Sequence, residues 1–224
     1  MDTLEPTDRS TVRRNRKRAV TDRAVLHALL ADALLVHVGV ASPHGPLVLP
    51  SAFGVDLDGP DDGGSLYLHG SVASPWLRAA GQPVCVTVTE LDGLVAGRSG
   101  FHHSMNYRSA VVLGTARDVT DVGERDRALD AIVDQMIPGR SATLRPSTRK
   151  ELAATAVLAV PLREASVKVR SGGPNDEPED VAAGIWGGHV PVRRVLGDPV
   201  PDSDAHGDVP AEVRALVQAS VQAR

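Results

Sequence analysis

The chain has 224 residues, with 24 lysines and arginines against 28 aspartates and glutamates, a formal net charge of −4. That length suits one β-rich domain, and the lack of a basic surplus argues against nucleic acid or an anionic membrane as a general partner. A single cysteine, Cys85, excludes a disulfide within the chain and a structural zinc site built from cysteines. No apolar run approaches the roughly 20 residues of a membrane span, and no signal peptide is recognised, so a cytoplasmic protein is expected.

Residues 1–19 are polar and basic, which predicts a solvated, flexible arm or an arm that contacts phosphate or nucleic acid. Residues 20–197 are predicted to form the domain. Residues 198–224 are rich in Pro and Asp before a weak helix from Ala211, which predicts a tail or a dimer arm. A helix is expected over residues 21–33, with Thr21 as its cap.

Runs rich in β-branched residues, partly alternating with polar ones, predict a mainly β chain. The Asp92-Gly93 pair inside one run could bend or turn its strand. A short helix is expected over residues 74–81, a longer one over 123–137 and another short one over 148–154, with a loop over 171–180. The predicted strands cover residues 34–41, 46–57, 65–71, 83–96, 109–119, 156–169 and 186–195.

Residues 98–116 join two predicted strands through a polar loop rich in functional side chains, which makes this loop the expected active site. His102 and His103 are adjacent, so in extended structure they would point to opposite faces and could not chelate one metal together. No partner at a suitable spacing completes a ligand set, so no metal site is expected. These side chains are expected to line a ligand pocket, and Tyr107 shares a face with Ser109 if the strand has begun there.

Ser71 and Ser74 precede a predicted helix, whose free N–H groups would suit a phosphate, although a serine cap is also common without a ligand. Lys168 and Arg170 lie two residues apart on one predicted strand and therefore on one face. They are either cations beside such an anion or the exposed end of the strand. His69 is either a structural histidine or a ligand contact.

Trp186 lies beside paired glycines and is either a core aromatic or a wall for a planar ligand. The sequence lacks a Ser-His-Asp order, a P-loop and a dinucleotide-binding glycine motif. These absences argue against a hydrolase and against a nicotinamide-binding fold.

Taken together, these segments resemble the pyridoxamine 5'-phosphate oxidase-like, FMN-binding split-barrel family, in particular its flavin-nucleotide-binding branch with the nitroimidazole-resistance reductases. The segments that carry the resemblance are residues 48–53, 67–71, 101–114, 168–170 and 186–193, of which His-His-Ser-Met-Asn-Tyr-Arg-Ser, from His102 to Ser109, is the specific part.

The resemblance implies a six- to seven-stranded antiparallel split β-barrel with peripheral helices, and a homodimer with FMN at its interface. It implies an FMN-dependent oxidoreductase that transfers hydride through flavin N5 to or from a small molecule, with His102, His103 or Tyr107 as the proton donor. Trp186 and Lys168 would come from the partner subunit. The predicted cofactor contacts are Leu49, Pro50, Ser51, Ala52, His69, Gly70, Ser71, Ser74, Ser109, Val111, Lys168, Arg170 and Trp186.

The chain departs from the vitamin B6 oxidases of this family, because Ser74-Pro75 stands where they carry an Arg-Lys pair and no matching histidine follows Arg193. Oxidation of vitamin B6 is therefore not expected. Members of the fold also use the deazaflavin F420 or haem, so both stay open beside FMN. The alternative to an enzyme is a flavin-, haem- or F420-binding sensor or carrier without turnover. A third reading, in which the basic arm binds nucleic acid, is disfavoured by the lack of aromatic residues among the basic ones.

Overall fold

The computed structural model describes residues 3–222, so residues 1–2 of the predicted arm and 223–224 of the predicted tail lie outside it. The α-helices are α1 (Arg23–Asp32), α2 (Val122–Met136), α3 (Arg149–Ala154), α4 (Pro178–Ala182) and α5 (Ala211–Gln222). Short 3-10 helices are η1 (Arg16–Arg18), η2 (Pro75–Ala79), η3 (Gly100–His102) and η4 (Ser141–Thr143). The strands are β1 (Ala19–Val20), β2 (Val36–Ser42), β3 (Gly45–Ser51), β4 (Phe53–Asp56), β5 (Ser65–Ser71), β6 (Pro83–Ala96), β7 (Ser104–Thr115), β8 (Arg117–Asp118), β9 (Thr155–Pro161), β10 (Ala165–Arg170) and β11 (Gly188–Pro191).

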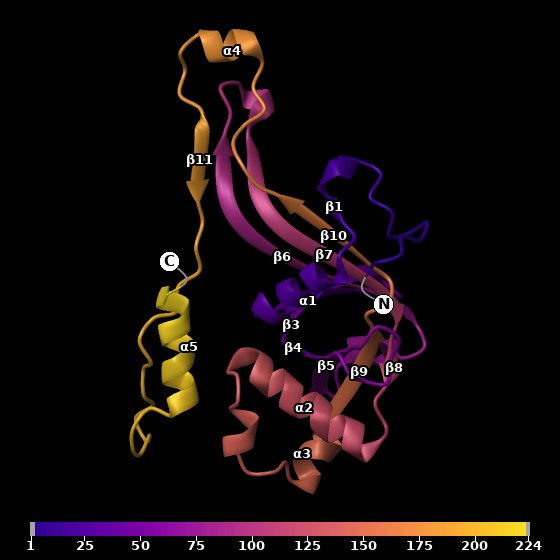
Figure 1. Cartoon of the computed structure of the whole chain (residues 1–224). Helices are drawn as coiled ribbons and strands as arrows, with labels where there is room; N and C mark the ends of the chain where they lie inside the picture. Colours follow the sequence, from indigo (N-terminus) through magenta and orange to yellow (C-terminus); the bar gives the residue numbers. More distant parts are fainter. Residues whose placement is uncertain (1–2, 223–224) are drawn as a thin grey trace.

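These strands pair antiparallel in two sheets (Figure 1). The larger sheet has the order β1-β10-β7-β6-β2-β3, and β11 pairs with the far part of β6. The smaller sheet has the order β4-β5-β9-β8. The chain crosses between the sheets four times, at Ala52, through η2, at Ala116 and between β9 and β10. The mainly β, antiparallel architecture predicted from the sequence is therefore confirmed.

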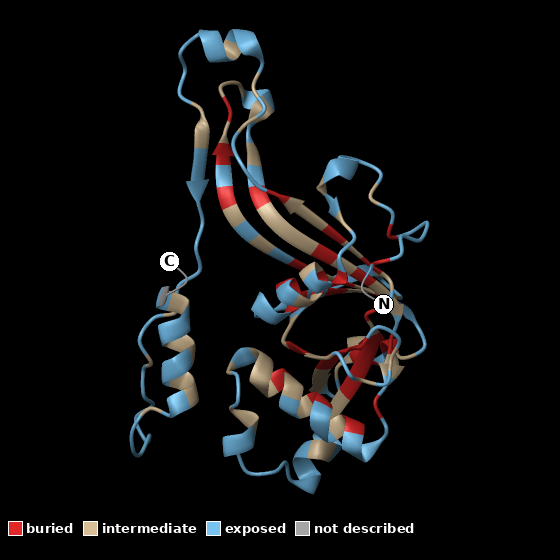
Figure 2. Cartoon of the chain, viewed as in Figure 1, coloured by how far each residue is buried: buried red, intermediate tan, exposed pale blue. Residues whose placement is uncertain are grey.

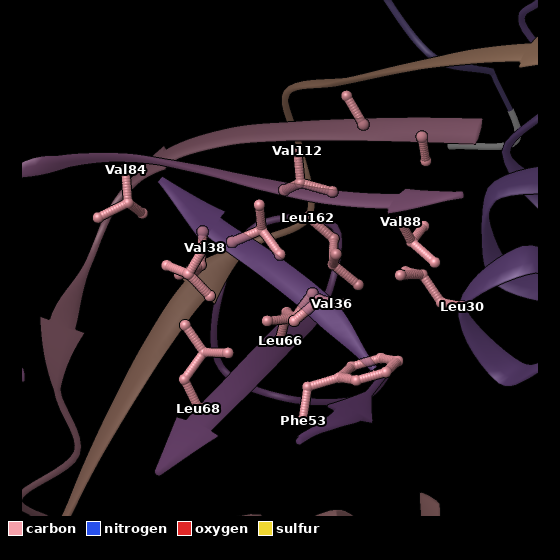
Figure 3. Packing of buried hydrophobic residues seen from close by; sticks show 14 of the residues in the cluster. Leu30, Val36, Val38, Phe53, Leu66, Leu68, Val84, Val88, Val112 and Leu162 are labelled. Carbon is pink, nitrogen blue, oxygen red and sulfur yellow. The ribbon is translucent and has the colours of Figure 1, made fainter. Parts of the chain in front are cut away.

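One apolar cluster fills the space between the two sheets (Figure 3). Alternation along β2 buries Val36 and Val38, whereas His37 between them is exposed. Phe53 and Leu68 meet them from the smaller sheet and are also fully buried. Since burying one such side chain contributes about 2 kcal/mol, this cluster is the main source of the barrel's stability.

The other face of the smaller sheet is covered by α2, and a polar network closes this second layer. Tyr67 is completely buried there, and its hydroxyl donates to Oε1 of Glu124 over 3.1 Å. The guanidinium of Arg117 pairs with Glu124 and, at 2.7 Å, with Asp61. The carboxylates are thus compensated by one arginine, which satisfies the requirement for burying charge. Helix α2 lies close to β4 because position 54 is a glycine, whose added Cβ would come within 2.6 Å of the α2 backbone.

Two helices begin within two residues of their predicted positions because capping side chains fix them. The carboxylate of Asp22 accepts from the N–H of Ala24 over 2.9 Å, so the predicted cap Thr21 is wrong by one residue. Helix α3 begins with a capping box, in which Thr148 and Glu151 each bond the other's backbone N–H.

Strands β6 and β7 form a hairpin that extends far beyond the barrel (Figure 1). Strand β2 pairs with β6 only from Val84 to Thr87. We call residues 90–106 and 171–191, which project from the barrel, the overhang. The strand predicted from Ser109 begins at Ser104, so the polar loop predicted before it is too long and shrinks to the turn of 97–103. Its polar side chains belong to a strand because they continue the ladder to β6, and the Asp92-Gly93 pair produces a bulge in β6.

Burial differs between these parts (Figure 2). Buried residues gather between the sheets and under α2, whereas α4, β11 and α5 are exposed or half-buried. Helix α5 is tied back to the barrel through Glu212, which accepts from Arg140 over 2.8 Å. Like every other helix within residues 3–222, α5 is too short or too polar to cross a membrane.

The N-terminal segment, predicted as a solvated arm, packs on the barrel at its start. Leu4 is 3% exposed and belongs to the core cluster, and Arg9 pairs with Glu164. The basic run that follows, from Arg13 to Lys17, is exposed, and it leads through η1 into β1, the edge strand that pairs with β10.

Candidate functional site

The outer face of the larger sheet carries several predicted cofactor residues. Ser109 on β7 lies directly opposite Lys168 on β10, and both alternate with buried neighbours that face the core. One step along the ladder, Tyr107 lies opposite Arg170. Tyr107 and Ser109 therefore share this face, as their spacing predicted.

A second row of the same face runs across four strands. The pairing register places Pro50 of β3, His37 of β2, Thr87 of β6 and Val111 of β7 next to one another. At roughly 4.8 Å per strand this row spans about 14 Å. His37 and Thr87 were not among the predicted residues, although the alternation of apolar and other residues over 36–40 could have placed His37 on this face.

Arg170 is used differently from Lys168, although one strand carries both. Its side chain is buried and donates to Oδ1 of Asn106 and to the carbonyls of Gly172 and Gly173. Burial lowers the pKa of Arg170, and the nearby charge of Arg18 lowers it further. Arg170 thus fixes the turn that leads out of β10, which leaves Lys168 as the half-exposed cation of this row.

The predicted backbone contacts lie on an edge strand. β3 is the last strand of the larger sheet, so the backbone of Leu49, Pro50 and Ser51 has no sheet partner on its outer side. The hydroxyl of Ser51 donates to the carbonyl of Ala52 over 2.8 Å. This edge offers backbone groups to a ligand without breaking the sheet.

The segment predicted to bind phosphate follows β5, and its backbone forms more hydrogen bonds within the chain than expected. Ser71 accepts from the N–H of Ala73 over 3.2 Å through its hydroxyl, and from the N–H of Ser74 over 2.8 Å through its carbonyl. Ser74 is the N-cap residue of η2 and Pro75 follows it in the first turn, as predicted, but the Ser74 side chain makes no capping bond. At Gly70 an added Cβ would lie 2.9 Å from Leu77, which explains why a glycine suits the approach to η2.

His69 is the most unusual polar residue near this segment. Phe53 pairs with Leu68, so the adjacent Ala52 lies beside His69 where the chain crosses between the sheets. Nδ1 of His69 is buried and has no hydrogen-bond partner among the described residues. Burial lowers the pKa of His69, so its ring is neutral at pH 7. A neutral, unsatisfied imidazole is suited to a ligand or a cofactor.

The remaining predicted residues lie at the tip of the overhang. Nδ1 of His103 is 3.0 Å from the carbonyl of Ser99, and Nε2 of His102 is 3.9 Å from a carboxylate oxygen of Glu177. Trp186 is 67% exposed and precedes β11, which begins at Gly188 and not at the predicted residue 186. Within residues 3–222 no three His, Cys, Asp or Glu side chains gather closely enough to hold a metal ion.

One chain therefore brings together two separate sets of predicted residues. The first set lies on the outer face and the neighbouring β3 and β5 ends, and the second lies at the tip. From Ser109 to Ser104 the strand rises about 3.4 Å per residue, so His102 and His103 lie roughly 20 Å from Ser109. The two sets do not meet within a single chain.

The family model of pyridoxamine 5'-phosphate oxidase matches residues 22–169 of this chain. Among solved structures, the flavocytochrome Anf3 from Azotobacter vinelandii is 37% identical, with a TM-score of 0.86 over 95% of this chain and 98% of that one. The FAD and heme binding protein from Mycobacterium smegmatis is 42% identical, with a TM-score of 0.81 over 88% of this chain and 96% of that one. Comparison with curated proteins found no match.

A protein assigned to 5-nitroimidazole antibiotic resistance from Bacteroides thetaiotaomicron is 23% identical, with a TM-score of 0.54 over 67% of this chain and 86% of that one. This likeness extends to the fold alone. Together with the two closer structures it confirms the predicted split-barrel fold. The match over residues 22–169 and the two relatives above 30% identity place the sequence in a known group: the chain belongs to the pyridoxamine 5'-phosphate oxidase family.

Proposed function

We propose that the protein is a flavin-dependent oxidoreductase that transfers hydride to or from a small molecule. The observation that carries this proposal is the open sheet face on which Ser109 and Lys168 lie opposite each other, beside the row from Pro50 to Val111. A bound flavin supplies the chemistry, since its N5 atom accepts or delivers hydride. The relatives named as a flavocytochrome and as an FAD and heme binding protein support a flavin cofactor.

The chain's own residues would orient that cofactor. The edge backbone of Leu49 to Ala52 can bond the polar rim of a planar ring. Because the N–H groups of Val72, Ala73 and Ser74 bond within the chain, the Ser74 hydroxyl, which makes no capping bond, would be the group that donates to a phosphate. Lys168 would stabilise negative charge on a reduced ring, because a half-buried cation interacts more strongly than an exposed one. FMN follows from the family resemblance, whereas the name of one relative, the FAD and heme binding protein, favours FAD, so the experiment compares both.

A homodimer is part of this proposal. His102 and His103 lie roughly 20 Å from Ser109 in their own chain, and Trp186 precedes β11 at the same tip, so these residues would serve the cofactor of a partner subunit. In that position His102 or His103 would hold or release the proton that accompanies hydride transfer. Tyr107 reaches the same face from its own chain, two residues from Ser109.

A second candidate function is electron transfer with haem, with no substrate turnover. The neutral ring of His69, whose Nδ1 lacks a partner among the described residues, favours it because haem iron binds neutral imidazole. One relative is named an FAD and heme binding protein and the other a flavocytochrome, which supports the same candidate.

The first test is the visible spectrum of the purified protein, followed by titration with FMN, FAD, F420 and haem. We expect a flavin spectrum, and Lys168→Ala should weaken flavin binding at least roughly tenfold, whereas the control Lys150→Ala on α3 should not. Saturable haem or F420 binding with no flavin binding would reject the proposed cofactor. If Lys168→Ala and Lys150→Ala bind flavin equally tightly, Lys168 does not belong to the flavin site.

Enzyme and carrier are separated by reoxidation of the reduced protein. An oxidoreductase should be reoxidised by a candidate acceptor faster than by oxygen alone, whereas a carrier should not. For the haem reading, His69→Ala should abolish the haem Soret band and leave the flavin spectrum. The exposed His44→Ala variant is the matched control.

A further inference from the structure

The overhang presents an unpartnered apolar row on its outer face. Val190 on β11, Leu94 on β6 and Met105 on β7 lie next to one another in register. They are 55%, 50% and 52% exposed, although all three are large apolar side chains. Phe101 and Trp186 near the tip are 91% and 67% exposed. Exposed apolar residues gathered in this way mark an interaction surface.

The tip of the overhang is acidic. Asp176, Glu177, Glu179 and Asp180 lie on or just before α4, and the single arginine nearby, Arg98, pairs with Asp176 at 2.6 Å. No lysine or arginine within residues 3–222 pairs with the other three carboxylates. The tip therefore carries an uncompensated negative charge beside the apolar row.

The N-terminal segment carries the opposite charge at the β1 edge of the same sheet, beside β10. Five basic residues crowd beside β10, and in the described part of the chain none of them forms an ion pair. This crowding is unfavourable in an isolated chain, because like charges repel one another. The five residues are Arg13, Arg14, Arg16, Lys17 and Arg18.

We propose that a second copy of this chain covers the outer face of the overhang, so that the acidic tip of each copy lies against the basic N-terminal segment of the other. A two-fold axis makes the contact twice, since the same surface occurs on both copies. When two such sheet faces pack together, their hairpins point in opposite directions. Each tip then lies over the barrel of the other copy. The apolar row continues the face of Ser109 and Lys168, so one interface would cover both.

A second copy explains more than nucleic acid would. Nucleic acid bound to the basic segment would neutralise its charge, but it would leave the apolar row and the acidic tip without a partner. A second copy supplies an apolar face and both charge signs at once. This packing rests on the homodimer of the proposed function. The experiment therefore has to distinguish a dimer that packs differently from a protein that forms no dimer.

Crosslinking tests the contact directly. In a Cys85→Ser background, one preparation carries Glu179→Cys and another carries Arg14→Cys, and the two are mixed before treatment with a short bismaleimide. We expect a crosslinked dimer from the mixture, and none from a matched mixture of Glu179→Cys with the exposed Lys150→Cys. A dimer by sedimentation that gives no crosslink in the first mixture overturns this packing and leaves the homodimer intact.

Charge reversal provides the second arm. Glu177→Lys, Glu179→Lys and Asp180→Lys together should weaken dimerisation at least roughly tenfold at low salt, and so should Arg13→Glu, Arg14→Glu and Lys17→Glu together. Mixing the two reversed proteins should restore a heterodimer. A full-length protein that sediments as a monomer at all concentrations overturns the homodimer itself. If the charge-reversed N-terminal segment abolishes DNA binding while the dimer mass in sedimentation stays unchanged, the segment binds nucleic acid. That result also overturns this packing.

Discussion

The barrel and the overhang share the strands β6 and β7, yet their side chains meet different surroundings. Inside the barrel, Val86 and Val112 alternate with outward residues and are almost fully buried against the smaller sheet. In the overhang, Leu94 and Met105 sit in the same ladder with about half of their surface exposed. The ladder alone does not decide burial. The face of the sheet does: Val86 and Val112 point toward the smaller sheet, whereas Leu94 and Met105 lie on the outer face, over which the described part of the chain places no second layer.

The largest effect is expected from a leucine inside the barrel. Leu68→Ala should lower the free energy of unfolding by about 3–4 kcal/mol, because it leaves a cavity beside Phe53 in the close-packed core. Urea unfolding at two protein concentrations measures it, and the loss should be the same at both. A loss below about 1 kcal/mol would show that the two sheets pack loosely.

A somewhat smaller loss is expected where the barrel buries charge. Arg117→Ala should cost about 2–3 kcal/mol, since it leaves Asp61 and Glu124 half-buried without their cation. The same unfolding assay applies. Arg145→Ala, which breaks an exposed pair with Glu151, should cost less than about 0.5 kcal/mol. Equal losses for both variants would mean that the network under α2 contributes no more than a surface pair.

The barrel is also expected to weaken in acid through its buried histidine. Burial holds the pKa of His69 below its ordinary value, so the unfolded chain binds more protons there than the folded one. Its contribution to stability is therefore complete above about pH 6.5 and is lost as the pH falls below that value. Unfolding between pH 7.5 and 5 should show a shallower slope for His69→Gln than for the wild type, whereas the exposed His44→Gln should keep the wild-type slope.

The smallest effect is expected in the overhang. Leu94→Ala removes the same atoms as Leu68→Ala, but at low protein concentration it should cost less than about 0.5 kcal/mol because half of the side chain is already in water. Its cost should rise with protein concentration if a second copy covers the row. A concentration-independent loss as large as that of Leu68→Ala would instead place Leu94 in a core of its own chain.

The sequence predicted most of the barrel because local signals and tertiary contacts agree there. The bounds of β5 and β6 were predicted to the residue, since both combine β-branched or apolar residues with punctuating residues at their ends. The stretch from Ser104 to Arg108 was assigned to a loop because it is polar, and only its partner strand makes it extended.

The candidate site was predicted in part for a similar reason. Strand alternation was enough to place Ser109, Lys168 and Tyr107 on one face. It could not show that Arg170 turns back to the carbonyls of Gly172 and Gly173, because alternation does not fix which way a long side chain bends. It could not show that the histidine pair lies roughly 20 Å away, because that distance depends on the pairing of β7 with β6. His37 was missed because its neighbours are apolar.

The bulge at Asp92 has a further consequence for how the C-terminal part of the chain is attached. The strands on both sides of the extra residue stay paired antiparallel. The carbonyl of Asp92 is free of the ladder and accepts from the N–H of Val192 over 3.0 Å, and its carboxylate binds Arg108. Deleting Asp92 would therefore produce a regular hairpin of the same register and remove one anchor of the segment after β11, whose Arg194 also pairs with Glu90 and Asp32. A single inserted residue thus adds an anchor for the C-terminal segment that can be gained or lost while the hairpin itself is kept.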